Sequence, residues 1–304
     1  MRKIAISIGD LNGIGIEIAL KSHKEISKFC KPVYAISKEM LNEASKLLKL
    51  PIDSNFTTSS CGKEFKIKPG VATKESGLYS YDSFVHALNL TKTKECDALV
   101  TLPVNKKAWE LAGIKYKGHT EALEDLLNEK ATMVLGCAQM YVALYTHHIP
   151  LKEVPALVNE DKVFDFLKEF YNSFKKEPIA VLGLNPHAGD FGVIGNEDEE
   201  ILKAIKKANK VFKKEIFFGP IVPDIAFTPK FRERFKYFIA MYHDQGLAPL
   251  KALFFEKSIN FSLGLSIIRT SVDHGTAFDI AYKDKNPSTL SYKEAILAAI
   301  EFCK

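Results

Sequence analysis

The sequence lacks long apolar runs, and it has few cysteines for a chain of 304 residues. Its five cysteines are scattered and odd in number, and no two of them form a Cys-x-x-Cys pair. A disulfide framework or a cysteine-built zinc site is therefore not expected, and a reducing compartment is the default. The first apolar run, Ile4–Ile8, is too short for a signal-peptide core or a membrane span. We expect a cytoplasmic protein with no membrane partner.

A strong charge of either sign is also missing. The chain carries 42 basic and 37 acidic residues, a net charge of +5, and its 46% hydrophobic content is that of an ordinary globular protein. This weak, diffuse positive field suits an anionic small molecule and does not predict a nucleic-acid partner. The length suits one large or two moderate domains.

Neither common nucleotide-binding fingerprint is present. The first strand is followed by a glycine-rich turn, Gly9–Gly15, and then by a helix pattern. The turn matches neither the Gly-x-Gly-x-x-Gly spacing nor the P-loop. Free backbone N–H groups at the start of that helix could cradle an anion. The glycines could equally serve only the tight turn between strand and helix.

Histidines follow three separate apolar strands of the predicted α/β fold. The three stretches are Tyr141–Thr146 before His147-His148, Ile179–Leu184 before His187, and Phe238–Met241 before Tyr242-His243-Asp244. Ligands bind at the carboxyl ends of strands in open α/β sheets. A lone histidine in such a place is usually structural, but three can converge on one divalent cation and leave a position open for a substrate oxygen. The pattern therefore predicts a catalytic metal site.

Other side chains indicate an anionic substrate. Lys251, Asn260 and Arg269 supply two positive charges and an amide, which suit a phosphate or a carboxylate, although solvated surface charge is the alternative. His119 stands beside a predicted helix start and could donate to a substrate, while Thr120 could cap that helix.

Less informative stretches carry weaker predictions. We expect residues 55–71 to form a peripheral hairpin or loop, and residues 271–281 to form a turn that opens a helix with amides available to an anion or nucleotide. Asn105 follows a strand ended by Pro103 and could hold an anion or cap the next helix. A last amphipathic helix is predicted over 292–302.

Four motifs, in this order, closely resemble the 4-hydroxythreonine-4-phosphate dehydrogenase family of vitamin B6 biosynthesis, and the likeness runs from Ile4 to the last helix. The motifs are Gly118–Glu121, Leu184–Gly189, Tyr242–Leu247 and Arg269–Ala277. The resemblance implies an α/β fold of two α/β/α lobes like those of isocitrate and isopropylmalate dehydrogenases, with the active site in the cleft between them. We expect one lobe over 1–120 and 246–304 and the other over 121–245.

The resemblance also implies roles for single residues. It implies a divalent metal (zinc, magnesium or cobalt) bound by His148, His187 and His243, and substrate contacts from His119, Thr120, Lys251, Asn260 and Arg269. It implies a cofactor loop for NAD or NADP that includes His274, Gly275, Thr276 and Ala277, and a homodimer that completes the active site. Lys251, Asp244 and His274 are candidates for the catalytic base.

The implied reaction is oxidation of 4-phosphooxy-L-threonine to a β-keto acid that decarboxylates to 3-amino-2-oxopropyl phosphate. The alternatives are a related dehydrogenase for another phosphorylated hydroxy acid, such as a four-carbon sugar acid phosphate, and a phosphate-acetyltransferase-like or non-catalytic ligand-binding protein. The chain departs from the family pattern in its first loop, where Leu11 and Ile16 stand in place of prolines. In the His147-His148 pair, the ligand is assigned to His148 because it precedes Ile149-Pro150.

Overall fold

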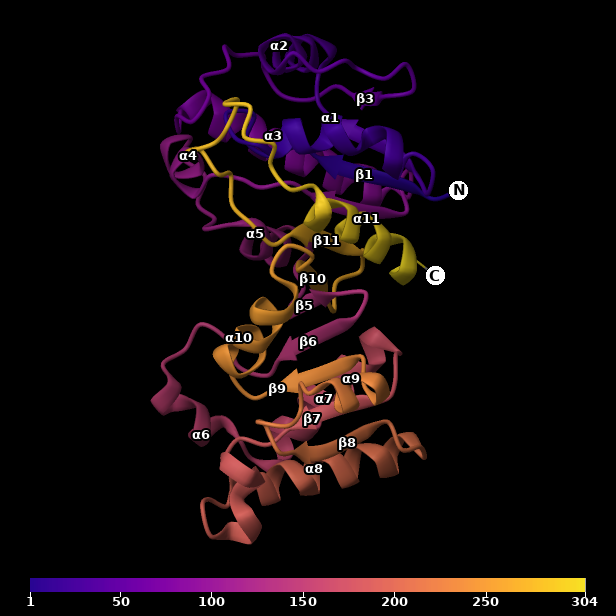
Figure 1. Ribbon diagram of the computed structural model, residues 1–304, viewed down its shortest axis with the longest axis vertical. Coiled ribbons are helices and arrows are strands. Elements are labelled where there is room, and N and C mark those ends of the chain that lie inside the picture. The colour runs from indigo at the N-terminus through magenta and orange to yellow at the C-terminus, as the bar shows by residue number, and fades with distance from the viewer. Residues whose placement is uncertain (304) are drawn as a thin grey trace. The chain divides into compact units, whose positions relative to one another are not determined.

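The computed structural model describes residues 1–303, and the chain divides into two compact units (Figure 1). Unit 1 consists of Met1–Ala131 together with the chain from Ile259 on, and unit 2 consists of Thr132–Ser258. The boundaries expected after residues 120 and 245 fall earlier in the chain than these. Each unit combines a largely parallel sheet with helices, so the predicted α/β class is confirmed.

The sheet of unit 1 has the strand order β3-β2-β1-β4-β11-β10. Its strands are β1 (Lys3–Ser7), β2 (Lys31–Ala35), β3 (Thr57–Ser59), β4 (Ala98–Thr101), β10 (Ile259–Leu263) and β11 (Arg269–Val272). Neighbouring strands from β3 to β11 are parallel, and β10 is antiparallel to β11. The segment 55–71, expected as a hairpin or loop, contributes only the short edge strand β3.

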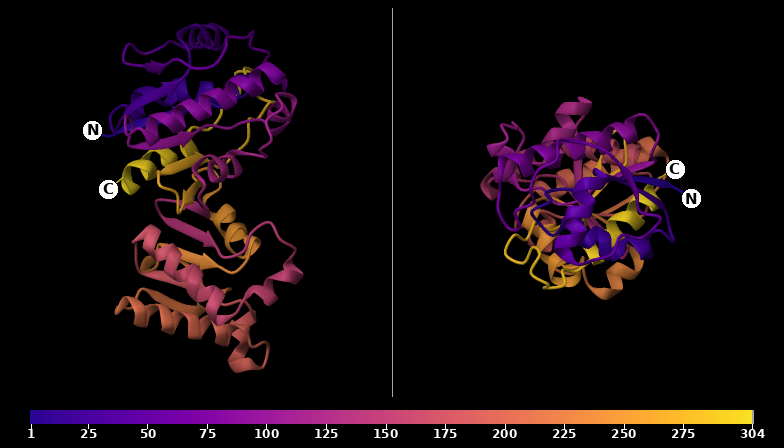
Figure 2. Two further views of the ribbon diagram at one scale, coloured as in Figure 1. Left: turned by 180° about the vertical axis from the view of Figure 1, so that it is seen from behind. Right: turned by 90° about the horizontal axis from the view of Figure 1, so that it is seen from above.

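Helices cover both faces of this sheet. They are α1 (Gly15–Ile26), α2 (Lys38–Leu48), α3 (Lys74–Lys92), α4 (Lys106–Leu111), α5 (His119–Leu127) and α11 (Leu290–Phe302). On one face Ala5 and Leu99 pack with Phe84 and Trp109, and Figure 2 shows α3 lying along this sheet. Side chains alternate along a strand, so the fully buried Ile4 lies on the other face, which is also covered.

Two local predictions in unit 1 are wrong. Thr120 is not the N-cap of α5, because the helix begins at His119 and its cap residue is Gly118. The Glu121 side chain accepts from the Lys117 N–H at 2.7 Å and so satisfies an amide before the helix start. The turn predicted over 271–281 does not open a helix: residues 273–289 contain none, and Ala277 has a φ of +44°, which a right-handed helix cannot contain. By contrast, Asn105 caps α4 through a 3.0 Å bond from the Ala108 N–H.

The sheet of unit 2 has the order β5-β6-β9-β7-β8. Its strands are β5 (Thr132–Cys137), β6 (Met140–Leu144), β7 (Ile179–Leu182), β8 (Phe217–Ile221) and β9 (Tyr237–Ala240). The strands from β6 to β8 are parallel neighbours, whereas β5 and β6 form an antiparallel hairpin. The three strands that precede histidines, β6, β9 and β7, are therefore adjacent and end at the same edge.

Helices and short 3₁₀ turns complete unit 2. They are η1 (Leu151–Glu153), α6 (Val154–Leu157), α7 (Glu160–Phe174), η2 (Pro186–Gly192), α8 (Glu197–Phe212), α9 (Pro229–Arg234) and α10 (His243–Phe254). Leu247 and Leu250 of α10 pack on Val142 and Phe238 on one face of the sheet. On the other face, the ring of Phe174 meets Tyr237 edge-on at 4.9 Å between centroids. Within residues 1–303, no helix is both long enough and apolar enough to span a bilayer.

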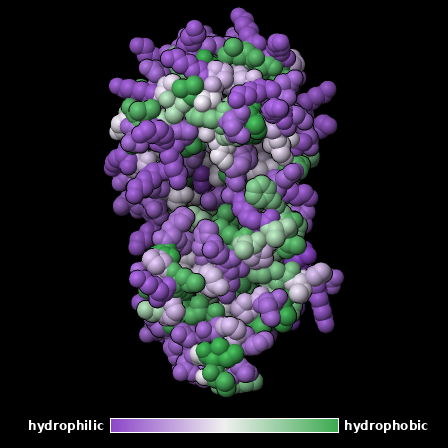
Figure 3. All heavy atoms as spheres, turned by 60° about the vertical axis from the view of Figure 1, so that its left-hand side comes forward, coloured by the Kyte–Doolittle hydropathy of each residue, from purple (hydrophilic) through white to green (hydrophobic). Residues whose placement is uncertain are grey.

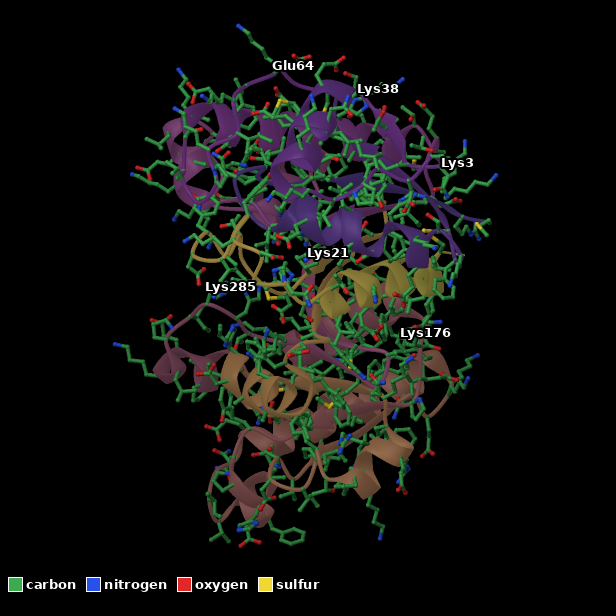
Figure 4. All side chains as sticks on the ribbon, turned by 45° about the horizontal axis from the view of Figure 1, so that its top comes forward. Lys3, Lys21, Lys38, Glu64, Lys176 and Lys285 are labelled. Atoms are coloured by element: carbon green, nitrogen blue, oxygen red, sulfur yellow. The ribbon has the colours of Figure 1, made fainter. Side chains whose placement is uncertain are left out.

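Charged side chains are spread over the surface instead of forming one basic face. The labelled Lys3, Lys38 and Glu64 are exposed and point away from unit 1 (Figure 4). Several lysines, such as Lys107 and Lys203, form exposed ion pairs with glutamates on the same helix. Such pairs contribute little stability, and they leave no concentrated positive field for a polyanion.

Candidate active site

His148 and His243 lie together at the strand-end edge of unit 2. Their ring centroids are 5.7 Å apart, and both residues line a hollow of about 150 Å³. The carboxylate of Asp244 lies 2.7 Å from His243 Nδ1, and the Nδ1 atoms of His147 and His148 lie 3.4 Å apart. A partner on Nδ1 leaves Nε2 available as a metal ligand. These two imidazoles therefore suit a shared divalent cation.

Backbone geometry sets the His148 ring in place. His148 has a φ of +51°, in the left-handed region that non-glycine residues seldom occupy. Such strain persists only when the surrounding structure imposes it, and it concentrates at ligand-binding sites. His243 is placed differently, because it is the first residue of α10 and follows Tyr242 directly after the end of β9.

His187 lies in a second hollow of unit 2, of about 510 Å³, which Asp190 and Phe191 also line. It belongs to η2, where every residue from His187 to Phe191 has a positive φ. In residues 1–303, no group of three or more His, Cys, Asp or Glu side chains is arranged to hold a metal. Two of the three predicted ligands thus lie together in one chain, and His187 does not join them.

The segment before His187 is held by Asp198, a residue that sequence reasoning missed. Its buried carboxylate accepts from the Leu184 N–H at 2.8 Å and from the Asn185 N–H at 3.1 Å. The Asn185 side chain adds a bond to the same carboxylate at 2.9 Å. The only sequence signal is an acidic residue in the first turn of α8, which is common at helix starts.

Unit 1 contains a buried cation that has no carboxylate partner among residues 1–303. Arg269 on β11 donates to Ser262 Oγ at 3.0 Å and to Thr101 Oγ1 at 2.8 Å, and its buried Nε has no protein partner in residues 1–303. Burial lowers the pKa of the guanidinium to about 9. A buried charge with unused donors is unfavourable by itself and favours an incoming anion.

His119 presents a second unused buried polar atom in unit 1. Its ring lies edge-on to Phe84 at 5.0 Å and to Trp109 at 5.5 Å, and its Nε2 is buried without a partner among the described residues. Burial, with a further contribution from the Arg269 charge, holds the pKa of His119 well below its usual value. The imidazole is therefore neutral and can donate or accept one hydrogen bond.

The remaining predicted substrate residues are placed as follows. Asn260 pairs with Ser271 across β10 and β11, while Arg269 pairs with Ser262, so Asn260 and Arg269 share one face of that ribbon. Thr120 is half-buried in the first turn of α5. Lys251 lies in α10 of unit 2, with Nζ 5.3 Å from the centroid of the Phe255 ring.

The predicted cofactor loop is attached to the first glycine-rich turn. Thr276 accepts from the Ile14 N–H at 3.1 Å, and Tyr282 donates to the Leu11 carbonyl at 2.7 Å. A Cβ at Gly13 would lie 2.8 Å from the Thr276 carbonyl oxygen, so only glycine permits this approach. His274 has a buried Nε2 without a partner among the described residues, while its Nδ1 lies 3.0 Å from the Gly275 carbonyl.

Asn12, which belongs to the altered first motif, anchors that turn on its other side. The Asn12 amide donates to the Val71 carbonyl at 2.8 Å and accepts from the Lys68 N–H at 2.8 Å. Its own carbonyl accepts from the Gly70 N–H at 2.8 Å. The lost prolines are therefore offset by a buried asparagine, whose only sequence signal is its place among glycines.

Comparison with known proteins gives a consistent result. A family model described as "Pyridoxal phosphate biosynthetic protein PdxA" matches residues 28–299. The 4-hydroxythreonine-4-phosphate dehydrogenase of Sulfurimonas denitrificans is 61% identical over 298 residues, which cover 98% of this chain and 97% of that protein. That of Campylobacter fetus is 55% identical over 302 residues, covering 99% and 98%.

Solved structures agree with the sequence relatives. The crystal structure of 4-hydroxythreonine-4-phosphate dehydrogenase from Klebsiella pneumoniae matches with a TM-score of 0.83 and 31% identity, and covers 100% of both chains. The match extends over both units, and the family resemblance seen in the four sequence motifs is confirmed. The chain belongs to the PdxA family of pyridoxal phosphate biosynthetic proteins.

Proposed function

We propose that this chain is a metal-dependent 4-hydroxythreonine-4-phosphate dehydrogenase. It oxidises the C–OH of 4-phosphooxy-L-threonine with NAD or NADP, and the resulting β-keto acid loses carbon dioxide to give 3-amino-2-oxopropyl phosphate. The observation that carries the proposal is the buried Arg269, which has an unused Nε and no carboxylate partner among residues 1–303, together with the neutral His119 in a chain that belongs to this family. A buried cation with an unused donor favours an anionic substrate.

The substrate is held through its charged ends. Arg269 binds the phosphate or the carboxylate, and Asn260, on the same face of the β10–β11 ribbon, donates an amide hydrogen bond. His119 and Thr120 add contacts from the start of α5, and Lys251 adds a positive charge from α10. Holding both ends of a small molecule orients the reacting carbon and so lowers the entropic barrier.

The divalent cation would be held by His148 and His243, with His187 as a third ligand supplied across a subunit interface, because His187 lies in a separate hollow of its own chain. His148 and His243 fit this role, because both rings lie in one hollow and each has a partner near Nδ1. When bound, zinc, magnesium or cobalt polarises the substrate hydroxyl and lowers its pKa. Asp244 keeps the proton of His243 on Nδ1. The general base that takes the proton from the substrate hydroxyl is Asp244, His274 or Lys251, which are side chains of a type that can accept a proton.

The nicotinamide cofactor contacts the loop that contains His274, Gly275, Thr276 and Ala277. When bound, it accepts hydride from the substrate carbon. The loop is held against the first glycine-rich turn by the Thr276 and Tyr282 bonds, so its backbone is ordered before a ligand arrives. A Cβ added at Gly275 would meet no other atom within 4 Å, so the backbone there is open to a ligand.

A homodimer completes the site. In unit 2 the turn around η2 exposes apolar side chains, with Phe191 fully exposed and Val193 81% exposed. Figure 3 shows hydrophobic side chains gathered on this unit. An apolar patch of this kind is typical of a surface covered by another chain. His187 lies in the same turn. A second copy of the chain packed on this turn would bring its His148 and His243 close to His187 and so complete the metal site. A cytoplasmic location suits the five free cysteines.

The test is a coupled activity and oligomer measurement. Purified protein is incubated with 4-phosphooxy-L-threonine, each divalent cation and either NAD or NADP, and reduced nicotinamide is followed by its absorbance. A four-carbon sugar acid phosphate and other phosphorylated hydroxy acids serve as competing substrates. We expect the fastest cofactor reduction with 4-phosphooxy-L-threonine. We also expect the active protein to have the mass of a dimer in solution. Faster reduction with another phosphorylated acid would assign that acid as the substrate. No reduction with any of these acids would refute the dehydrogenase proposal.

A further inference from the structure

A chain of buried hydrogen bonds crosses the strand-end edge of unit 2. The Thr146 hydroxyl donates to the Met241 carbonyl at 2.7 Å, and the Met241 N–H donates to Gln245 Oε1 at 2.7 Å. The Gln245 amide nitrogen then donates to the Gly183 carbonyl, again at 2.7 Å. Thr146 and Gln245 are 7% and 8% exposed, so water competes little for these bonds.

The Gln245 carboxamide stands where the β7–β9 ladder stops. Parallel pairing of these strands runs from Ile179 with Tyr237 to Val181 with Ile239. Two residues further on, Gly183 and Met241 are no longer paired with each other. One side-chain amide accepts from Met241 and donates to Gly183, as a backbone peptide group would do. Gln245 thus holds the two strands at a fixed separation at the point where they diverge.

The three backbone segments that this chain of bonds joins each lead to one of the predicted metal-binding histidines. Thr146 comes two residues before His148, Met241 two before His243, and Gly183 four before His187. We infer that Gln245 is a positioning residue that sets the His187 segment relative to His243 and His148. This inference rests on the proposed function, since it assumes that these histidines bind the cation.

The His187 segment depends on this contact because its other supports come from a different side. The Gly183 N–H donates to the Ile221 carbonyl of β8 at 2.8 Å, and Asp198 of α8 holds the amides of Leu184 and Asn185. These contacts tie the segment to β8 and α8, whereas the Gln245 amide ties it to β9 and α10. The five residues of η2 with positive φ have few alternative arrangements, so a shift at Gly183 is passed on to His187 and is not absorbed in the turn.

The ordinary role of a buried glutamine is to satisfy nearby backbone groups without affecting a ligand site. Gln245→Glu separates the two roles. Burial raises the pKa of a carboxyl, so both measurements are made at about pH 8 or above, where the introduced side chain is ionised. An ionised carboxylate keeps the acceptor for Met241 but cannot donate to Gly183. Its added negative charge would by itself strengthen cation binding. A weaker affinity therefore reports on position and not on charge.

The first measurement uses metal-free protein. Amide hydrogen exchange in residues 184–195 is compared between wild type, Gln245→Glu and the matched control Gln139→Glu, which makes the same change in the β5–β6 turn. We expect exchange about tenfold faster in this segment for Gln245→Glu, because one buried bond is lost. We expect no change for the control. Wild-type exchange in Gln245→Glu would overturn the inference, whatever the metal affinity.

The second measurement is the zinc dissociation constant, obtained by competition with a chromophoric chelator in the absence of substrate. Loss of a group that orients a metal ligand weakens binding by about 10- to 100-fold. We expect this loss in Gln245→Glu, and a much smaller additional loss when His187→Ala is already present. Equal or tighter zinc binding by folded Gln245→Glu, or a full loss persisting without the His187 ring, would refute the inference.

If Gln245→Glu does not fold, Gln245→Met takes its place, because methionine has a similar volume and lacks both hydrogen bonds. The same two measurements then test the role of Gln245. If wild type itself binds no divalent cation, the proposed metal site fails. The exchange measurement then still decides whether Gln245 orders the His187 segment. The failures of the two proposals are therefore distinguishable.

Discussion

Arg269 Nη2 donates to Thr101 Oγ1 at a distance of 2.8 Å. The guanidinium is buried and has no carboxylate partner among the described residues. A buried charge without a counterion destabilises the empty protein, and replacing it by an apolar side chain of similar volume is often neutral or stabilising. The same charge becomes favourable once an anion binds. Stability and ligand binding therefore place opposite demands on this residue.

We expect Arg269→Met to melt at the same temperature as wild type, or higher, in phosphate-free buffer. Added inorganic phosphate should raise the melting temperature of wild type, because a ligand that binds only the folded state stabilises it, and should leave the variant unchanged. Thermal unfolding with and without phosphate measures both effects. Arg2→Met, at a half-exposed arginine of unit 1 that pairs with Asp97, should keep the wild-type response. An undiminished phosphate effect in Arg269→Met would contradict the anion site.

His243→Ala should abolish divalent-cation binding and turnover while the fold remains. The His243 side chain is 40% exposed and stands at the first position of α10, so its loss should change the free energy of unfolding by about 1 kcal/mol or less. Metal content per chain, the circular dichroism spectrum and cofactor reduction check the three parts. His86→Ala, which removes a bond to Ser59 in unit 1, is the control and should retain metal. An active, metal-free His243→Ala protein would refute the ligand role.

The strands that organise unit 2 were predictable because each combines an apolar run with a clear end. Tyr237–Ala240, Ile179–Leu182 and Met140–Leu144 are buried at every position, and this composition predicts central strands. The sequence also places a histidine shortly after each strand. Adjacent parallel strands then bring those segments to one edge, so the candidate site follows from local pattern and sheet geometry together.

The errors fall where long-range contacts decide the backbone. The stretch after Val272 has the composition of a turn, but its backbone depends on the first glycine-rich turn, more than 250 residues earlier in the sequence. The Ile14 N–H donates to the Thr276 carbonyl, and the next residue, Ala277, has a positive φ. The contact from Gln245 to Gly183 spans 62 residues and has no local signature. The start of α5 was misplaced by two residues, because Gly118 takes the cap position that Thr120 would otherwise favour.

Asn12→Ala should destabilise the protein by about 2 kcal/mol, because the Val71 carbonyl and the Lys68 N–H both lose their partner in a partly buried setting. Asn12→Asp keeps the acceptor for Lys68 and loses the donor to Val71, so about half of the loss should remain. Chemical unfolding of the three proteins measures these differences. Asn89→Ala, at an exposed position of α3, is the control and should be neutral. Equal stability of wild type and Asn12→Ala would show that the first loop is held by other contacts.

The carboxyl of Asp10 gives a pH-dependent prediction. It is fully buried and accepts from the Asn12 N–H at 2.9 Å and from Ser76 Oγ at 3.2 Å. Burial raises its pKa from 3.8 to about 6, against the opposing effect of these two bonds. The folded state therefore retains the proton at pH values where the unfolded chain has released it. The stability that Asp10 contributes is complete below about pH 4 and is lost as the pH rises to about 6.

Asp10→Asn should remove this dependence, since an amide does not titrate and can still accept from Asn12. A pKa difference of this size corresponds to about 3 kcal/mol. Relative to wild type, the variant should gain roughly that free energy of unfolding between about pH 4 and pH 7. Urea unfolding at several pH values measures it, and the difference between the two proteins cancels the carboxylates they share. Asp161→Asn, at an exposed position of α7, should show no such trend. Parallel stability curves for wild type and Asp10→Asn would mean that Asp10 is ionised in the folded protein at pH 5, and that its burial is offset by a charge partner.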